Sequence, residues 1–216
     1  MTTKLRHHLR PLASPQNLLL LLSAFLLLAL AILPAATSEL RRLAGGHLPP
    51  DWHFHYRPEQ LHFLFDAYGK EGRELFVFVE MTADLVWAVC TALLSIGMLE
   101  WLRRRLSIAL PYWLLYLPLG ILGLEILENA GLVALTFSYP FESYLLSRLT
   151  ALATVGKWMG YGVVVGLLAI GAALWAWRFF WGSRERGSGF AGTRGLSKRV
   201  RDRRIEESDC TTKVTL

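Results

Sequence analysis

Residues 17–36, NLLLLLSAFLLLALAILPAA, contain no charged side chain and are long enough to form a membrane-crossing helix. A hydrocarbon core of about 30 Å needs about 20 helical residues. The composition of the whole chain agrees, because 53% of its 216 residues are hydrophobic. An ordinary globular domain contains about 45–50% apolar residues even when glycine is counted. This composition excludes fibrous, disordered and disulfide-scaffold proteins and indicates an integral membrane protein with polar ends.

Three further stretches are long and apolar enough to cross a membrane. With the first stretch they predict an all-α, polytopic, four-helix membrane bundle, with spans at 17–36, 75–99, 108–137 and 149–177. Glycines at 156, 160, 162 and 166 predict that the fourth span packs closely against two neighbouring helices. The remaining parts are a basic N-terminus, a long loop and a basic tail, at 1–16, 37–74 and 178–216.

The long loop and the tail carry weaker signals. In the loop, residues 58–65 have the pattern of a short amphipathic helix, in which Leu61, Phe63 and Phe65 partly face lipid. The sequence at 69–73, GKEGR, is typical of a turn that leads into the second span. The tail is rich in glycine, serine and arginine, which predicts disorder.

The first span has an alternative interpretation as a cleaved signal peptide. A basic start, with Lys4, Arg6 and Arg10, precedes the apolar stretch, and small residues follow it at Ala36. The apolar stretch is nevertheless longer than the 7–15 residues that are usual in a signal peptide. We therefore favour a retained helix.

The distribution of lysine and arginine predicts the orientation of the chain. The N-terminus, the loop at Arg103, Arg104 and Arg105, and the tail are basic, which places both termini in the cytoplasm. The net charge of +6 comes largely from these parts. The basic run at 198–204 is expected to contact anionic lipid. No nucleic-acid partner is expected for so short a run beside a membrane.

The most informative residues are the ionisable side chains inside the predicted spans. Each costs at least about 2.5–3.5 kcal/mol at the centre of a bilayer, so each indicates a functional site by default. Helical spacing places them on three facing polar edges at a similar depth. The edges comprise Glu80, Asp84, Trp87 and Thr91 in the second span, Glu125, Glu128 and Asn129 in the third, and Thr154, Lys157 and Tyr161 in the fourth.

Four carboxyls in this predicted layer face the single lysine, Lys157. Like charges in a dry site cannot all ionise, so at least one or two of the acids should hold a proton at neutral pH. A protonated acid beside an ionised one is an acid/base pair. The same residues could instead be a clamp that holds the bundle together. Both interpretations stay open.

The long loop contains side chains that could form a metal site. His53 and His55 could supply two ligands, and His62 or Asp66 a third. Histidines that alternate with aromatic residues also suit an interfacial segment without metal. The second interpretation is favoured, and no metal or cofactor is expected.

Short motifs resemble those of a group of small four-helix membrane proteins of unknown function. They include Glu59, Asp84, a basic exit from the second span, Glu128-Asn129 and Lys157-Trp158, over about 100 of the 216 residues. A weaker likeness, at Tyr68-Gly69-Lys70 and at 80–83, is to the emopamil-binding sterol isomerases. The first resemblance implies architecture only, and the second implies chemistry on a lipid.

Three functions are compatible with these patterns. The first is a non-enzymatic accessory or assembly protein whose polar layer holds the bundle or binds a partner membrane protein. The second is an acid/base isomerase or cyclase of a lipophilic, sterol-like or isoprenoid-like substrate. In it Glu80, Asp84 and Glu128 would be the acid/base groups, Lys157 would orient one of them, and Trp87 could face a developing carbocation. The third is proton-coupled transport by an oligomer.

Overall fold

The structure of the protein is a computed structural model that describes residues 11–106, 111–141 and 143–212, and this part of the chain contains helices and no strands. Four helices are long and apolar enough to cross a membrane, at Pro15–Leu43, Pro58–Leu106, Trp113–Ser138 and Tyr144–Phe180. The predicted all-helical chain with four such helices is therefore confirmed. The chain divides into two units, Met1–Ile170 and Gly171–Leu216, and the candidate site lies in the first.

The first apolar helix consists of α2 (Pro15–Leu27), a π-helical turn η1 (Leu28–Ile32) and α3 (Leu33–Leu43). Ser14 caps the start, because its hydroxyl accepts a hydrogen bond from the Asn17 amide at 3.3 Å. Pro34 lacks the amide that would donate to the preceding turn. We attribute the wide turn directly before it to this missing donor.

The second apolar helix begins at Pro58, well before the predicted start of its span. It consists of α4 (Pro58–Val79), a π-helical turn η3 (Glu80–Asp84) and α5 (Leu85–Leu106). Gly69 interrupts it with φ of 60°, a conformation that glycine adopts without steric cost. The GKEGR sequence therefore forms a kink within a continuous helix.

The side chains at the start of α4 differ from the expected amphipathic pattern. Leu61 and Phe65 are buried and only Phe63 is exposed, so the expectation that all three partly face lipid is wrong. Leu61 and Phe65 belong to a core with residues of α3, α6 and α7. The sequence pattern showed an apolar face at 58–65, but not the helices that cover it.

The last two apolar helices are α6 (Leu117–Ser138), which follows the short 3₁₀ turn η4 (Tyr112–Tyr116), and α7 (Tyr144–Thr212). The helix α7 continues through the tail as far as Thr212, so the prediction of a disordered tail differs from the structure. The tail contains no proline. Its arginine, lysine and glutamate residues have good intrinsic helix propensity, which the composition argument underweighted.

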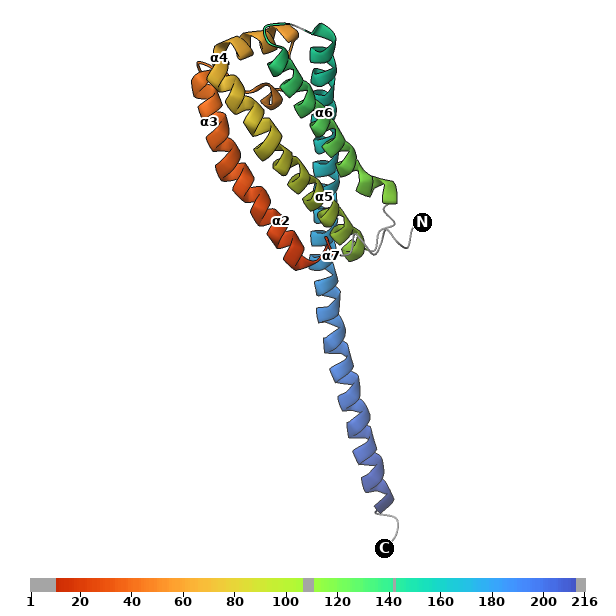
Figure 1. Cartoon of the computed structure of the whole chain (residues 1–216). Coiled ribbons are helices and arrows are strands. Elements are labelled where there is room, and N and C mark those ends of the chain that lie inside the picture. The colour runs from red at the N-terminus through yellow and green to blue at the C-terminus, as the bar shows by residue number, and fades with distance from the viewer. Residues whose placement is uncertain (1–10, 107–110, 142, 213–216) are drawn as a thin grey trace. The chain divides into compact units, whose positions relative to one another are not determined.

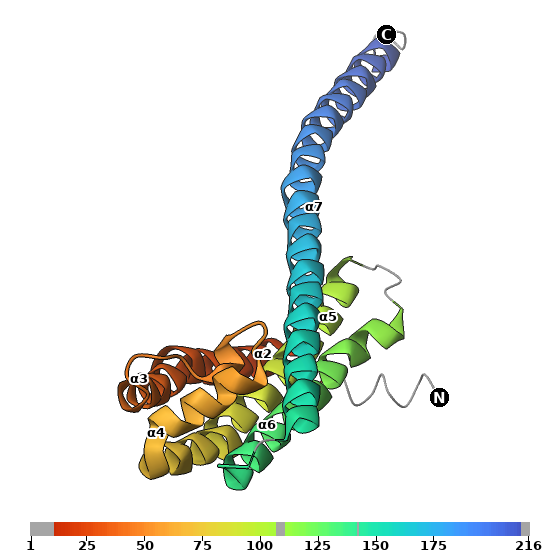
Figure 2. The ribbon, with the colours of Figure 1, turned by 90° about the horizontal axis from the view of Figure 1, so that it is seen from above.

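The helix formed by α4 and α5 lies at the centre of the first unit. Within it, α5 packs against both α2 and α6, and α3 packs against α4. The two views show α2–α3 and α6 on opposite sides of this central helix (Figures 1 and 2).

Glycines bring α7 close to α6. A methyl group added to Gly160 would lie 2.6 Å from Ile121 Cγ1, and one added to Gly156 would lie 3.1 Å from Leu124 Cδ1. At Gly162 and Gly166 an added methyl group would meet no atom within 4 Å. Of the two predicted glycine faces, only the first therefore packs against a described helix.

Candidate functional site

Lys157 of α7 joins two carboxylates of α6 inside the first unit. Its Nζ atom lies 2.9 Å from Glu125 Oε1 and also forms an ion pair with Glu128. All three residues are at least 95% buried. A buried charge is stable only when its partners are close and well oriented. The spacing of Glu125 and Glu128 by three residues puts both on the α6 face toward α7.

Two hydroxyl groups donate hydrogen bonds to the two carboxylates that Lys157 joins. The Thr154 hydroxyl donates to Glu128 Oε1 at 2.6 Å, and the Tyr161 hydroxyl donates to Glu125 Oε2 at 3.1 Å. Thr154 also lies 3.3 Å from the Tyr56 hydroxyl, which belongs to the segment between α3 and α4. Every carboxyl on α6 therefore has donors from α7.

Asn129 of α6 connects to the π-helical turn η3. Its Nδ2 atom donates to Asp84 Oδ2 at 2.7 Å and to the Glu80 carbonyl at 3.3 Å. Both Glu80 and Asp84 are buried. Wide turns of this kind occur often at functional sites because they change the direction of side chains. Here the turn carries two carboxyls separated by four residues toward the interior of the bundle.

The carboxyls of η3 line a partly open cavity of about 290 Å³ between the apolar helices, called the internal cavity below. Its polar wall includes Glu80, Asp84, Glu125, Lys157 and Tyr161, and its apolar wall includes Trp87 and Leu33. This size lies near the lower end of small-molecule pockets, which are about 300–1,000 Å³. The cavity thus combines charged and apolar surfaces as ligand pockets commonly do.

Three tryptophans form much of the apolar wall. They come from three parts of the chain, as Trp52 between α3 and α4, Trp87 on α5 and Trp158 on α7. Trp87 is held in place by stacking on Phe25 of α2, with ring centroids 4.4 Å apart. Aromatic faces attract cations and accommodate apolar molecules.

Some predicted site residues do not line the cavity. Glu128 and Asn129 lie behind its wall and hold Lys157 and Asp84, respectively. Thr91 is also outside the lining, and its buried hydroxyl has no hydrogen-bond partner. The structure therefore brings together Glu80, Asp84, Glu125, Lys157, Trp87 and Tyr161 around one space.

Sequence reasoning did not place Asp51 or Trp52 in the site. Asp51 and Trp52 belong to a short 3₁₀ helix, η2 (Pro50–Trp52), and reach the cavity from outside the apolar helices. Buried polar atoms without a partner include Asp51 Oδ1, Tyr68 Oη and Glu80 Oε2. The sequence signal that could have pointed to Asp51 is its position between two prolines and a tryptophan, Pro49-Pro50-Asp51-Trp52.

Burial changes the acidity of two groups in the segment between α3 and α4. It raises the pKa of Asp51 to about 7, because removal of water outweighs the attraction of Lys157. Repulsion from Asp84 and Glu128 acts in the same direction. Burial also raises the pKa of the Tyr56 hydroxyl above its ordinary value.

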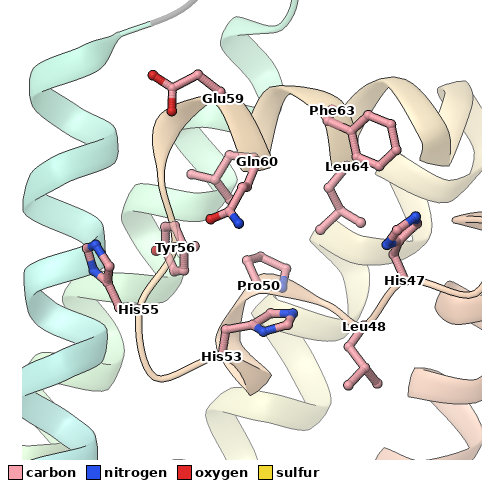
Figure 3. A pocket seen from close by; sticks show the side chains of 11 residues that line it. His47, Leu48, Pro50, His53, His55, Tyr56, Glu59, Gln60, Phe63 and Leu64 are labelled. Atoms are coloured by element: carbon pink, nitrogen blue, oxygen red, sulfur yellow. The ribbon is translucent and has the colours of Figure 1, made fainter.

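A second pocket of about 350 Å³ lies at the surface beside the same segment. Its lining includes His47, His53 and His55, and Figure 3 shows His47 and His55 at opposite ends of it. Within the residues that the structure describes, no group of three histidine, cysteine or acidic side chains could hold a metal ion. Leu48, Pro50 and His53 line this pocket, whereas Pro49, Asp51 and Trp52 line the internal cavity. The segment therefore forms a wall between the two.

No family model, curated protein or solved structure matches the chain. The function is therefore inferred from the geometry of the site.

Proposed function

We propose that the protein is a multi-pass membrane protein that binds a lipophilic molecule in the internal cavity and performs acid/base chemistry on it, as an isomerase does. The proposal rests on the environment of the Glu80 Oε2 atom. This atom belongs to a side chain that is only 2% exposed, has no hydrogen-bond partner and lies in the wall of the cavity. A buried polar group without a partner costs about 1–3 kcal/mol. A bound molecule with a polar group would remove this cost.

The polar layer has two parts, which favour different roles. In the first part, Glu125 and Glu128 each pair with Lys157 and accept a hydrogen bond from a hydroxyl, as expected for a clamp. In the second part, Glu80 has no donor for its Oε2 atom. A clamp explains the first part only. In an assembly protein the polar layer would only join helices, and this role does not explain why Glu80 is buried without a donor.

The apolar wall supports a lipophilic ligand. The cavity is lined by Ala29 and Leu33 of the first apolar helix and by three tryptophans. A molecule with a hydrocarbon body would contact this wall while its reactive or polar end met Glu80 and Asp84. The tryptophan faces would also stabilise a positive charge that develops during proton addition.

We also propose that the four apolar helices lie in a bilayer with both termini in the cytoplasm. The basic run Arg103, Arg104 and Arg105 supports this orientation, and two of these arginines bind Glu100 at 2.6 and 2.7 Å. The segment between α3 and α4, with Asp51, would then lie on the opposite side of the membrane. The long basic helix of the tail would meet anionic lipid on the cytoplasmic side.

The test uses the full-length protein purified with its native lipids. Lipids bound to wild type are identified by mass spectrometry, and the complex is then incubated in D₂O. We expect the bound molecule to gain deuterium at carbon with wild type and not with Glu80→Gln. Glu74→Gln is the matched control, because the Glu74 side chain is 71% exposed on the same helix.

Either of two results would overturn the proposal. One is a purified protein that carries no lipophilic molecule above the level of the surrounding lipid or detergent. The other is deuterium incorporation by Glu80→Gln at the wild-type rate. Capture of a stoichiometric membrane partner, without any small molecule, would support the assembly role instead.

A further inference from the structure

Three of the buried polar atoms without hydrogen-bond partners belong to Asp51 and Glu80, which line the cavity, and to Tyr68, which does not. They are Asp51 Oδ1, Tyr68 Oη and Glu80 Oε2, and they belong to η2, α4 and η3. The charges of Asp51 and Glu80 both act on the Tyr68 hydroxyl. Glu80 and Tyr68 are 2% and 3% exposed, which leaves little access to water.

Asp51 is one of the acids whose charge acts on Glu80. Asp51 and Glu80 also line the same cavity. Two carboxylates that lie close together away from water cannot both ionise.

The other charged groups around the pair are already engaged. Glu80, Asp84, Glu125 and Lys157 are the titratable groups that line the cavity with Asp51 besides Tyr161, and Glu128 lies behind them. Lys157 is held by the two carboxylates of α6, and Asp84 accepts from Asn129. None of these contacts supplies a donor to Glu80 Oε2 or Asp51 Oδ1.

We propose that Asp51 is the acid/base partner of Glu80, and that the two carboxyls share one proton. This inference rests on the proposed function and assigns the second catalytic group to the segment between α3 and α4. The sequence had suggested Glu128 for such a role. Glu128 is held by Lys157 and Thr154 and does not line the cavity.

A shared proton permits a double-bond shift that needs no other reactant. Protonated Glu80 adds its proton to one alkene carbon, which leaves a cation on the neighbouring carbon. Ionised Asp51 then removes a proton from the next carbon, and that electron pair forms the new double bond. The substrate keeps its formula, and the shared proton has moved from Glu80 to Asp51. Its return to Glu80 restores the pair.

Asp51 as a whole residue is only half-buried, which permits exchange of its proton with water. It belongs to the wall between the surface pocket and the internal cavity, outside the apolar helices. Burial raises the pKa of its carboxyl to about 7. The group can therefore gain and lose a proton near neutral pH.

The experiment measures protonation of Asp51 directly. The full-length protein is treated with a lipophilic carbodiimide, which modifies protonated carboxyls in apolar surroundings, at values from pH 5 to pH 9. Site-resolved mass spectrometry then gives the midpoint for modification of Asp51. In wild type we expect this midpoint near pH 7. In Glu80→Gln the amide donates to ionised Asp51, so the midpoint should fall by at least one pH unit. Glu74→Gln should leave it unchanged.

A midpoint for Asp51 that is the same in wild type and Glu80→Gln would overturn the pair, as would an Asp51 that is not modified at any pH. The proposed function is tested separately by the bound lipid. If Glu80→Gln abolishes deuterium exchange but does not move the Asp51 midpoint, the proposed function is supported and the proton sharing between Asp51 and Glu80 is refuted. If the midpoint moves but no lipophilic molecule is bound, the proton sharing is supported and the proposed function is refuted.

Discussion

At the scale of residues, the polar layer separates into carboxyls that are paired with Lys157 and carboxyls that are not. Its members could largely be named from the sequence, because charged side chains within apolar stretches are rare and costly. Their pairing could not be predicted. Glu125 and Glu128 are two acids about one helical turn apart, as Glu80 and Asp84 are, and the position of Lys157 distinguishes the two pairs. Asp51 was missed because the segment around it has no helical period.

Removal of the lysine should be costly. Lys157→Met leaves Glu125 and Glu128 buried without their shared cation, and loss of one partner of a buried pair costs about 3–5 kcal/mol. We expect a large fall in the apparent melting temperature of the purified protein. Lys70→Met is the control, because the Lys70 side chain is 87% exposed. Equal melting temperatures for the two variants would refute the clamp.

Asp51 should make stability depend on pH. Its pKa is about 7 in the folded chain, above the ordinary value of 3.8. Between these values the folded chain holds a proton that the unfolded chain releases, so stability falls as pH rises through this window. Wild type should therefore melt at a lower temperature at pH 8 than at pH 5. In Asp51→Asn this difference should shrink, and thermal unfolding of both proteins at the two pH values measures it. A pH dependence that Asp51→Asn leaves intact would contradict the assignment.

At the scale of elements, interruptions of helices shape the site. The turn predicted at 69–73 signalled one of them in the sequence, whereas the wide turn at 80–84 contains neither proline nor glycine and was not predicted. That turn depends on tertiary contacts, including the hydrogen bonds from Asn129. The predicted helix at 58–65 is the start of α4, but its continuation into the second span was not predicted, since the charged residues at 70–74 interrupt the apolar pattern.

The contact between α6 and α7 should be sensitive to small changes. Gly160→Ala puts a methyl group 2.6 Å from Ile121 Cγ1, too close for an ordinary contact. Overpacking of this kind costs about 1–3 kcal/mol. Gly162→Ala is the matched control two residues away, where the methyl group meets no atom within 4 Å. Melting temperatures of the two variants in the same detergent provide the measurement. A destabilisation by Gly162→Ala as large as that by Gly160→Ala would show that the packing is different.

At the scale of the whole molecule, composition and periodicity predicted an all-helical chain with four apolar helices, and the structure agrees. Hydropathy succeeds here because apolar stretches of this length need no tertiary information to be recognised. The helical tail and the buried start of α4 were not predicted, because propensity and long-range contacts determine them. The cavity was not predicted either, since its lining comes from five separate parts of the chain.

The proposed orientation predicts which loops are accessible from each side. A cysteine that replaces exposed Lys70 should react with a membrane-impermeant maleimide added to intact cells. A cysteine that replaces Arg104 should react only after the cells are opened. Both variants are made with Cys90 and Cys210 changed to serine. The opposite pattern would reverse the orientation and would place Asp51 on the cytoplasmic side.

The central claim is that the internal cavity holds a lipophilic molecule, and native mass spectrometry of the full-length protein tests it most directly. The variant Ala29→Trp fills the cavity from the first apolar helix, whereas Ala31→Trp alters an exposed position on the same helix. The account predicts one tightly bound small molecule per chain in wild type and in Ala31→Trp, and loss of that mass in Ala29→Trp. A bound molecule that survives equally in both variants, or no bound molecule in wild type, would contradict it.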